Sequence, residues 1–239
     1  LGVTDRKVFI DKGIMFIMKV GGVLHKIGRD VVGDLIVKIE DSLNLGLDIV
    51  VAPDYALNFN LNKPNTKLER EDLYNKIKRL SRDSPTLIIP GTLSYPISNK
   101  EMAHAAPVFL RGDFREYFKE RDQGEGEIAE NVGLIYRRGN NKENRFNFLG
   151  KNFALEICGD HGNQDIRGCD CELILAYDTK AGCHIDTLND SFARKAIVCD
   201  GYRPFVAAFD FNPENRPKTS LLERNIRKLS GGEIHIFDI

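Results

Sequence analysis

The sequence lacks a hydrophobic run long enough to cross a bilayer. Its longest apolar runs, Gly13 to Val20 and Leu47 to Val51, are far shorter than the roughly 20 residues that a membrane helix needs. The amino terminus also lacks the basic, apolar and small-residue segments of a signal peptide. We therefore expect no membrane association and a cytoplasmic location. Because the chain begins at Leu1 rather than Met, a removed targeting segment is compatible with the sequence.

An excess of one charge is also missing. The chain has 34 basic and 35 acidic residues, for a net charge of -1. Binding to a nucleic-acid backbone usually needs a basic excess or a basic stripe, and a pair such as Arg137 and Arg138 is too short to form one. The composition therefore argues against a nucleic-acid partner.

Motifs for nucleotide cofactors are absent as well. Gly91, Gly124 and Gly126 stand without the spacing of a Walker or dinucleotide-binding loop, so we interpret them as turn residues. The first half contains no cysteine, and the whole chain has an odd number, five. A chain of this size does not need disulfides, so we interpret the cysteines as reduced thiols. We expect no cofactor and no structural metal.

The chain is long enough for one independent core. With 239 residues, 42% of them hydrophobic, it fits a single globular domain spanning residues 1–239. Strand and helix patterns alternate in the first half. We predict strands at 13–20, 47–52 and 86–92, and helices at 34–45 and about 67–82, the second with Thr66 and Glu69 at capping-box spacing.

The second half predicts hairpins followed by further strands and helices. The hairpins are expected at 106–118, with a turn at 111–113, and at 146–158, with a turn at 150–151. Residues 120–130 are expected to form a loop or a short helix. Beyond them we predict strands at 172–177, 205–211 and 233–239, and helices near 190–198 and from Ser220, where Glu223 has capping-box spacing. This order predicts mixed sheets covered by helices in a layered α/β domain.

Three reactive side chains stand at the ends of predicted strands. Asp54, Lys119 and Cys158 each follow such a strand, and in layered α/β folds this edge is where ligands bind. A carboxylate can take the proton of a thiol, and an ammonium lowers the pKa of that thiol and stabilises an oxyanion. The three groups together suit a covalent acyl-transfer site.

The segments around these residues resemble three signature blocks of the nitrilase, or carbon-nitrogen hydrolase, superfamily. They read LDIVVAPDYALN at Asp54, REYFKERDQGEGE at Lys119 and NFALEICGDHG at Cys158, in the family's order, and the resemblance extends from Asp34 to Tyr177. It implies a four-layer α-β-β-α sandwich and a Glu, Lys, Cys triad that acts on amides, nitriles or carbamoyl groups. It also implies that Lys119 and the Gly159 amide hold the developing negative charge.

The resemblance implies further site residues. Many members have a second glutamate after the lysine, and Glu127 matches it best, with Glu125 as the substitute. Asp160 keeps an acidic position that is usual in the family, and we place Tyr55 and His161 with it in the substrate region. Members commonly pair through helices, which implies a homodimer or larger homo-oligomer.

Two departures from the family pattern matter. Asp54 stands where the family has glutamate, and a displacement of roughly 1 Å of a catalytic group can cost about a hundredfold in rate. Gly159 replaces the aromatic residue that often follows the nucleophile, which opens room for a different substrate. The primary hypothesis is a thiol-dependent hydrolase acting on a small amide or nitrile. The alternative is a weak or inactive member of this fold that acts as a binding module.

Two other roles, a zinc site and a protease pair, fit the spacing of these residues less well. Cys158, His161, Cys169 and Cys171 could supply four zinc ligands, but the single residue between the last two is too few for a zinc knuckle. A Cys158–His161 protease pair needs a special turn to bring residues three apart together. His104 and His184 have no partner pattern, so for both we favour a surface position or a core position with its hydrogen bonds satisfied.

Overall fold

The computed structural model describes most of the chain. The described residues are 7–10, 13–25, 32–140, 144–161, 168–177, 193–202, 204–211, 219–221, 224–229 and 232–239. His184 and Cys183 lie outside them. Within these ranges, no helix combines the length and the apolar character that a bilayer span requires.

The larger of two main sheets has nine strands. Their order is β16 (Asn225–Leu229), β17 (Gly232–Asp238), β3 (Lys19–Leu24), β4 (Ile49–Val51), β5 (Leu87–Ile89), β7 (Glu101–Leu110) and β6 (Leu93–Pro96). β8 (Asp113–Phe118) and β9 (Ile135–Tyr136) also pair with β7. The central strands β3, β4 and β5 are parallel, and β5 meets β7 antiparallel, so the sheet is mixed.

The second main sheet has six strands. They follow the chain in order: β10 (Arg145–Phe148), β11 (Lys151–Ile157), β12 (Cys171–Ala176), β13 (Lys195–Asp200), β14 (Phe205–Phe211) and β15 (Thr219–Leu221). β11, β12 and β13 are parallel and the remaining pairs are antiparallel. A separate hairpin joins β1 (Lys7–Ile10) to β2 (Gly13–Phe16).

The two main sheets pack against each other around one apolar core. Val20 and Val51 of the larger sheet share this core with Leu155, Leu173 and Ile197 of the smaller sheet, and all five are buried. Because side chains alternate along a strand, Glu156 and Ile174 point to the opposite face of the smaller sheet. This face is also buried, around Ile174 and Val198.

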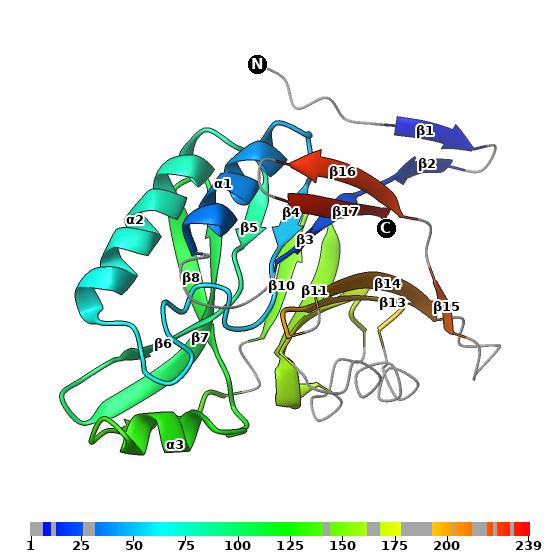
Figure 1. Cartoon of the computed structure of the whole chain (residues 1–239). Coiled ribbons are helices and arrows are strands. Elements are labelled where there is room, and N and C mark those ends of the chain that lie inside the picture. The colour runs from blue at the N-terminus through cyan, green and yellow to red at the C-terminus, as the bar shows by residue number, and fades with distance from the viewer. Residues whose placement is uncertain are drawn as a thin grey trace.

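Helices α1 (Val32–Leu43) and α2 (Lys67–Arg82) cover the outer face of the nine-stranded sheet (Figure 1). Their buried residues Leu35, Ile39, Leu73 and Ile77 pack against that sheet in a second core. The predicted capping box of α2 is confirmed: the Glu69 amide donates to Thr66 Oγ1, and the Thr66 amide donates to Glu69 Oε2. A short helix α3 (Glu125–Glu130) follows the loop after Lys119.

Two predicted helices are wrong. The chain near 190–198 enters β13 at Lys195, and Ser220 lies in β15, paired with β14. Glu223, the other half of the expected capping box, lies outside the described residues. The segment from Lys195 to Asp200 instead forms a parallel ladder with β12, and its residues 196–200 are buried on both faces of the strand, as in a central strand of a covered sheet.

The strand expected at 13–20 is wrong as a single element, because the chain there divides into β2 of the separate hairpin and β3 of the nine-stranded sheet. The strand expected at 86–92 is shorter, at Leu87–Ile89. The other expected strands and helices are confirmed within a few residues. β7 and β8 form the first hairpin, with the turn at Arg111 and Gly112, and β10 and β11 form the second. The fold is a mixed α/β arrangement of two packed mixed sheets, with helices on the larger one. Cys158 lies directly after β11, Lys119 directly after β8, and Asp54 shortly after β4.

Candidate active site

Asp54 is fully buried and is held by a cluster of polar groups. Its Oδ1 atom accepts hydrogen bonds from the Thr92 hydroxyl and from the Tyr55 amide, the latter at 3.1 Å. His104 Nε2 lies 2.7 Å from the same oxygen. The other oxygen, Oδ2, is buried and has no hydrogen-bond partner within the described ranges. Asp54 therefore offers one carboxylate oxygen for a further contact.

The loop that carries Asp54 approaches the end of β5 closely. Gly91 has a φ of +90°, and a Cβ atom at this position would lie 2.2 Å from the Pro53 carbonyl oxygen. Glycine is therefore required where the two strand ends meet. The close approach lets Thr92 reach both Asp54 and the Tyr55 amide.

The Asp54 carboxyl group is tuned toward its ionised form. Burial alone would raise its pKa, but the charge and hydrogen bond of His104 oppose this effect. The charge of Lys119 and the Thr92 hydrogen bond add to the opposition, so the pKa of Asp54 falls below its ordinary value. Asp54 is therefore a carboxylate at neutral pH, despite its burial.

Lys119 is buried and paired with Glu125. Lys119 Nζ lies 2.6 Å from Glu125 Oε1, and both side chains are at most 1% exposed. Glu127, the expected partner, is instead exposed on the first turn of α3. The expectation for Glu127 is therefore wrong in position, and the substitute Glu125 makes the contact. The helix sets this choice, because Glu125 at its first residue faces inward while Glu127 faces solvent.

The charge of Lys119 couples the acidic groups to the thiol. Burial disfavours the ammonium, but the negative charges of Asp54, Glu125 and Cys158 together raise the pKa of Lys119 above its ordinary value. The pKa of Glu125 is lowered: burial would raise it, but the charges of His104 and Lys119 outweigh burial. Lys119 therefore stays protonated beside two carboxylates and the Cys158 side chain.

Cys158 stands on a sharp bend between β11 and a single 3-10 turn. That turn, η2, spans Cys158–Asp160, and Cys158 has a φ of +46°, a left-handed conformation that is costly for a residue with a Cβ atom. Its carbonyl accepts a hydrogen bond from the His161 amide at 3.1 Å. The side chain is 9% exposed. Strained residues of this kind concentrate at functional sites.

Asp160 fastens the loop after Lys119. Its two carboxylate oxygens accept hydrogen bonds from the amides of Glu120 and Arg121, at 3.0 and 2.7 Å. Burial raises the pKa of Asp160, and these hydrogen bonds only partly offset the rise. Asp160 thus connects the turn that carries Cys158 to the chain that follows Lys119.

Tyr55 closes the network on the side of Asp54. Its hydroxyl donates to Glu125 Oε1 at 2.6 Å, and its φ of +58° is also left-handed. Its ring lies 4.5 Å from that of His104 and 5.5 Å from that of Tyr177. Burial, followed by the nearby negative charges, raises the pKa of Tyr55 far above the ordinary value, so it remains a hydrogen-bond donor.

His104 is the residue that sequence reasoning missed. It is fully buried, Nε2 lies 2.8 Å from the Thr92 hydroxyl as well as near Asp54, and Nδ1 lies 2.8 Å from Ser94 Oγ. Of the two positions expected for His104, the surface position is wrong and the core position with satisfied hydrogen bonds is confirmed, and one of its partners is the candidate site residue Asp54. The available signal was a histidine within an apolar strand, which must find a polar partner when buried.

His161, which the sequence analysis places in the substrate region, joins two buried glutamates. Its Nδ1 atom lies 2.9 Å from Glu156 Oε2 and 2.6 Å from Glu172 Oε1. Burial would lower the pKa of His161, but the hydrogen bonds and charges of both glutamates raise it to about 10. Burial and the proximity of Glu172 raise the pKa of Glu156 to about 9. The three groups therefore share protons.

These three residues are also where a cation could bind. One cluster of potential metal ligands is found among the described residues. It consists of Glu156, His161 and Glu172, whose ligand atoms all lie within 4.8 Å of one another. The four-ligand set of Cys158, His161, Cys169 and Cys171 does not converge in this way. An ion would have to displace the hydrogen bonds that the three side chains already make.

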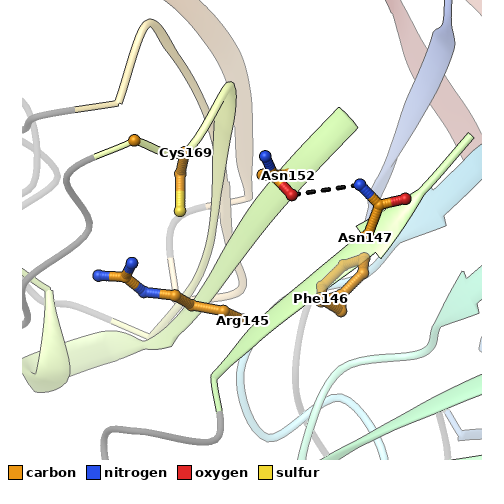
Figure 2. A pocket seen from close by; sticks show the side chains of 6 residues that line it. Arg145, Phe146, Asn147, Asn152 and Cys169 are labelled. Carbon is orange, nitrogen blue, oxygen red and sulfur yellow. Dashed lines mark hydrogen bonds between the residues drawn. The ribbon is translucent and has the colours of Figure 1, made fainter. Parts of the chain in front are cut away.

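A separate pocket lies at the opposite end of β11. It is lined by Arg145, Phe146, Asn147, Asn152, Gly168 and Cys169. Figure 2 shows the side-chain amides of Asn147 and Asn152 directed at each other, joined by a hydrogen bond of 3.2 Å. Cys158 follows Asn152 by six positions along the chain, or roughly 20 Å of extended strand. This pocket is therefore not part of the candidate active site.

Comparison with known proteins identifies the fold. No family model and no curated protein matches the chain. Among solved structures, a mutant of the amidase from Nesterenkonia sp. AN1, with acrylamide added to its active-site cysteine, superposes with a TM-score of 0.67 at 12% identity, covering 93% of each chain. A double mutant of that amidase in complex with acrylamide gives 0.68 at 12% identity, covering 97% of this chain and 93% of that one.

A third mutant is described as a Nesterenkonia AN1 amidase from the nitrilase superfamily. It gives a TM-score of 0.65 at 12% identity, covering 93% of this chain and 90% of that one. The expected fold class is confirmed: the chain has the fold of nitrilase-superfamily amidases. At this identity the likeness concerns the fold and leaves the reaction to be argued from the residues.

Proposed function

We propose that the protein is a thiol-dependent hydrolase that cleaves non-peptide carbon-nitrogen bonds through a covalent acyl intermediate on Cys158. The observation that carries the proposal is the buried Lys119 ammonium, which pairs with Glu125. Tyr55 connects this pair to Asp54, and Asp160, in the turn that begins at Cys158, accepts hydrogen bonds from the amides that follow Lys119. A buried ammonium beside a thiol and an ionised carboxylate is the arrangement that acyl transfer to sulfur requires.

The first half of the reaction forms the intermediate. The Asp54 carboxylate takes the thiol proton, and the Cys158 sulfur attacks the carbonyl carbon of an amide. The negative charge that develops on oxygen is stabilised by the Lys119 ammonium and the Gly159 amide. The C–N bond then breaks and the nitrogen takes the proton from Asp54. The amine departs, and the acyl group remains on Cys158 as a thioester. A nitrile would form a thioimidate instead: the sulfur adds to the nitrile carbon, the nitrogen takes the proton from Asp54, and no C–N bond breaks in this step.

The second half releases the acyl group. Asp54 takes a proton from water as the oxygen attacks the thioester carbon, the C–S bond breaks, and the departing sulfur takes the proton back from Asp54 to give the acid and the thiol. The Oδ2 atom of Asp54, which has no hydrogen-bond partner among the described residues, suits both proton transfers, since Oδ1 is already engaged by three neighbours. Glu125 would orient Lys119 through the contact between its Oε1 atom and Lys119 Nζ.

The test is turnover of a panel of small amides, nitriles and carbamoyl compounds. Exchange of Cys158 for Ala should abolish turnover and the acyl adduct on the protein seen by mass spectrometry. The matched control is Cys169→Ala, which removes a buried thiol in the distant pocket and should leave both unchanged. Full activity of Cys158→Ala would refute the proposal.

The competing function is a binding module on the same fold. It is favoured by Asp54, whose side chain is one methylene shorter than the glutamate of the family pattern. The variant Asp54→Glu separates the two functions. A large gain in Cys158 reactivity supports a weakened enzyme, whereas an inert thiol in both forms supports a binding module.

Assembly is a second part of the proposal. We expect a homodimer or larger homo-oligomer, by analogy with the fold, and exposed apolar residues on the two covering helices are compatible with it: Val37 on α1 and Leu68 on α2, which is 75% exposed. A hydrodynamic mass of one chain would remove this expectation. The partner in the site is a small molecule, with neither nucleic acid nor membrane involved.

A further inference from the structure

The Gly159 amide, the backbone donor expected to stabilise the oxyanion, is engaged by a side chain of the protein itself. Gln123 Oε1 accepts a hydrogen bond from this N–H group at 2.7 Å. The Gln123 side chain ends in a primary carboxamide, the functional group that the proposed reaction cleaves. Its oxygen therefore accepts the hydrogen bond that the carbonyl oxygen of a bound substrate would accept.

The absence of a side chain at position 159 makes this contact sterically possible. A Cβ atom on Gly159 would lie only 2.0 to 2.2 Å from the carbon, nitrogen and oxygen of the Gln123 carboxamide. Any other residue at 159 would thus displace Gln123. The Gln123 side chain therefore occupies the space that the aromatic residue of the family pattern would fill at position 159.

The backbone on both sides of Gln123 is fastened to the site. Asp160 accepts hydrogen bonds from the amides of Glu120 and Arg121, and Glu125 Oε2 accepts one from the Gln123 amide at 2.7 Å. Gln123 itself is exposed, so its side chain can rotate into solvent without uncovering a core. With its backbone fixed and its side chain free to rotate, Gln123 can be displaced by a ligand without disturbing the loop.

We propose that Gln123 competes with the substrate for the Gly159 N–H group and thereby selects substrates whose carbonyl oxygen can replace its carboxamide. This inference rests on the proposed function, because it treats Gly159 as an oxyanion donor. Neutral hydrogen bonds differ by modest free energies, so removal of the competitor should strengthen binding of a carbonyl compound about fivefold. Gln123 is a selectivity residue and takes no part in bond breaking.

The test compares two thiol reagents on the whole chain. Acrylamide carries a primary amide that can use the Gly159 donor, whereas methyl methanethiosulfonate has no carbonyl group. Labelling of Cys158 is followed by mass spectrometry. Gln123→Ala should raise the acrylamide rate about fivefold at low reagent concentration and leave the methanethiosulfonate rate within about twofold. Gln123→Glu should slow acrylamide, because a carboxylate accepts the amide proton more strongly.

The matched control is Asn147→Ala, which truncates an exposed carboxamide in the distant pocket and should change neither rate. If Gln123→Ala changes both labelling rates equally, Gln123 only covers the thiol sterically and the proposal is overturned. No change in either labelling rate would also overturn it. A wild-type Cys158 that reacts well but is indifferent to position 123 refutes only this inference. A Cys158 that is inert in every variant refutes the proposed function together with it.

Discussion

Asp54 is held through one carboxylate oxygen, and this has a direct consequence for its reactivity. Oδ1 is shared by Thr92, Tyr55 and His104, while Oδ2 stays without a hydrogen bond in the described part of the chain. A short side chain fixed in this way can be as well placed as a longer one that is held loosely. The neighbours of Asp54 therefore matter as much as its length.

His104 is the positioning residue to test. After burial, its charge and hydrogen bond are the largest influences on the pKa of Asp54, and they lower it. His104→Gln should therefore raise the pKa of Asp54 and move the acid limb of the pH-rate profile to higher pH. Alkylation of Cys158 by iodoacetamide, measured from pH 4 to 9, should also slow by about ten- to a hundredfold near the acid limb.

The control for this experiment is His25→Gln, because His25 is buried beside Lys38, at the start of the segment leading to α1. This variant should leave the acid limb in place. A merely structural role for His104 would lower the rate at all pH values alike, so an unmoved acid limb would contradict the assignment.

At the scale of elements, the bend between β11 and η2 carries local strain. Cys158 adopts a φ of +46°, which costs an L residue roughly 1 to 2 kcal/mol relative to glycine. Cys158→Gly should therefore be more stable than Cys158→Ala by about 1 kcal/mol, although both lack the thiol. Urea unfolding of the two variants checks this. Equal stability, or a more stable alanine variant, would show that the bend relaxes.

Elements with local signals were predictable, and elements fixed by pairing were not. The start of helix α2 is predictable from Thr66 and Glu69, because a capping box acts within four residues. Ser220 offered the same spacing with Glu223, but it lies in a strand paired with β14. Neighbouring strands supply backbone hydrogen bonds that a local motif cannot outweigh, so tertiary pairing decided this segment.

At the scale of the whole molecule, two histidines should limit stability from opposite sides. The pKa of His161 is raised to about 10 by Glu156 and Glu172, so its contribution is full below about pH 6.5 and is lost as pH rises toward 10. The pKa of His25 is lowered to about 4 by burial and by Lys38, so its contribution is lost as pH falls from about 6.5 to 4.

Thermal unfolding across pH 4 to 10 checks both directions. On the alkaline side the unfolding free energy should fall by an amount on the order of a few kcal/mol, because the raised pKa values of both His161 and Glu156 mean that their contributions are lost as pH rises toward 10. His161→Gln should flatten the alkaline side, and His25→Gln should flatten the acid side. If the loss of stability at alkaline pH persists in His161→Gln, another titrating group causes it.

The sequence alone determined the class of fold, most strands of the two sheets and the three candidate residues Asp54, Lys119 and Cys158. These features depend on the periodicity of apolar residues and on short motifs, which act over a few positions. Only the tertiary structure decided which carboxylate meets Lys119, that His104 holds Asp54, and that Gln123 occupies the Gly159 amide. Each of these contacts joins different elements of the fold. Their geometry follows from how helix α3, the strands and the loops pack, which local sequence patterns do not encode.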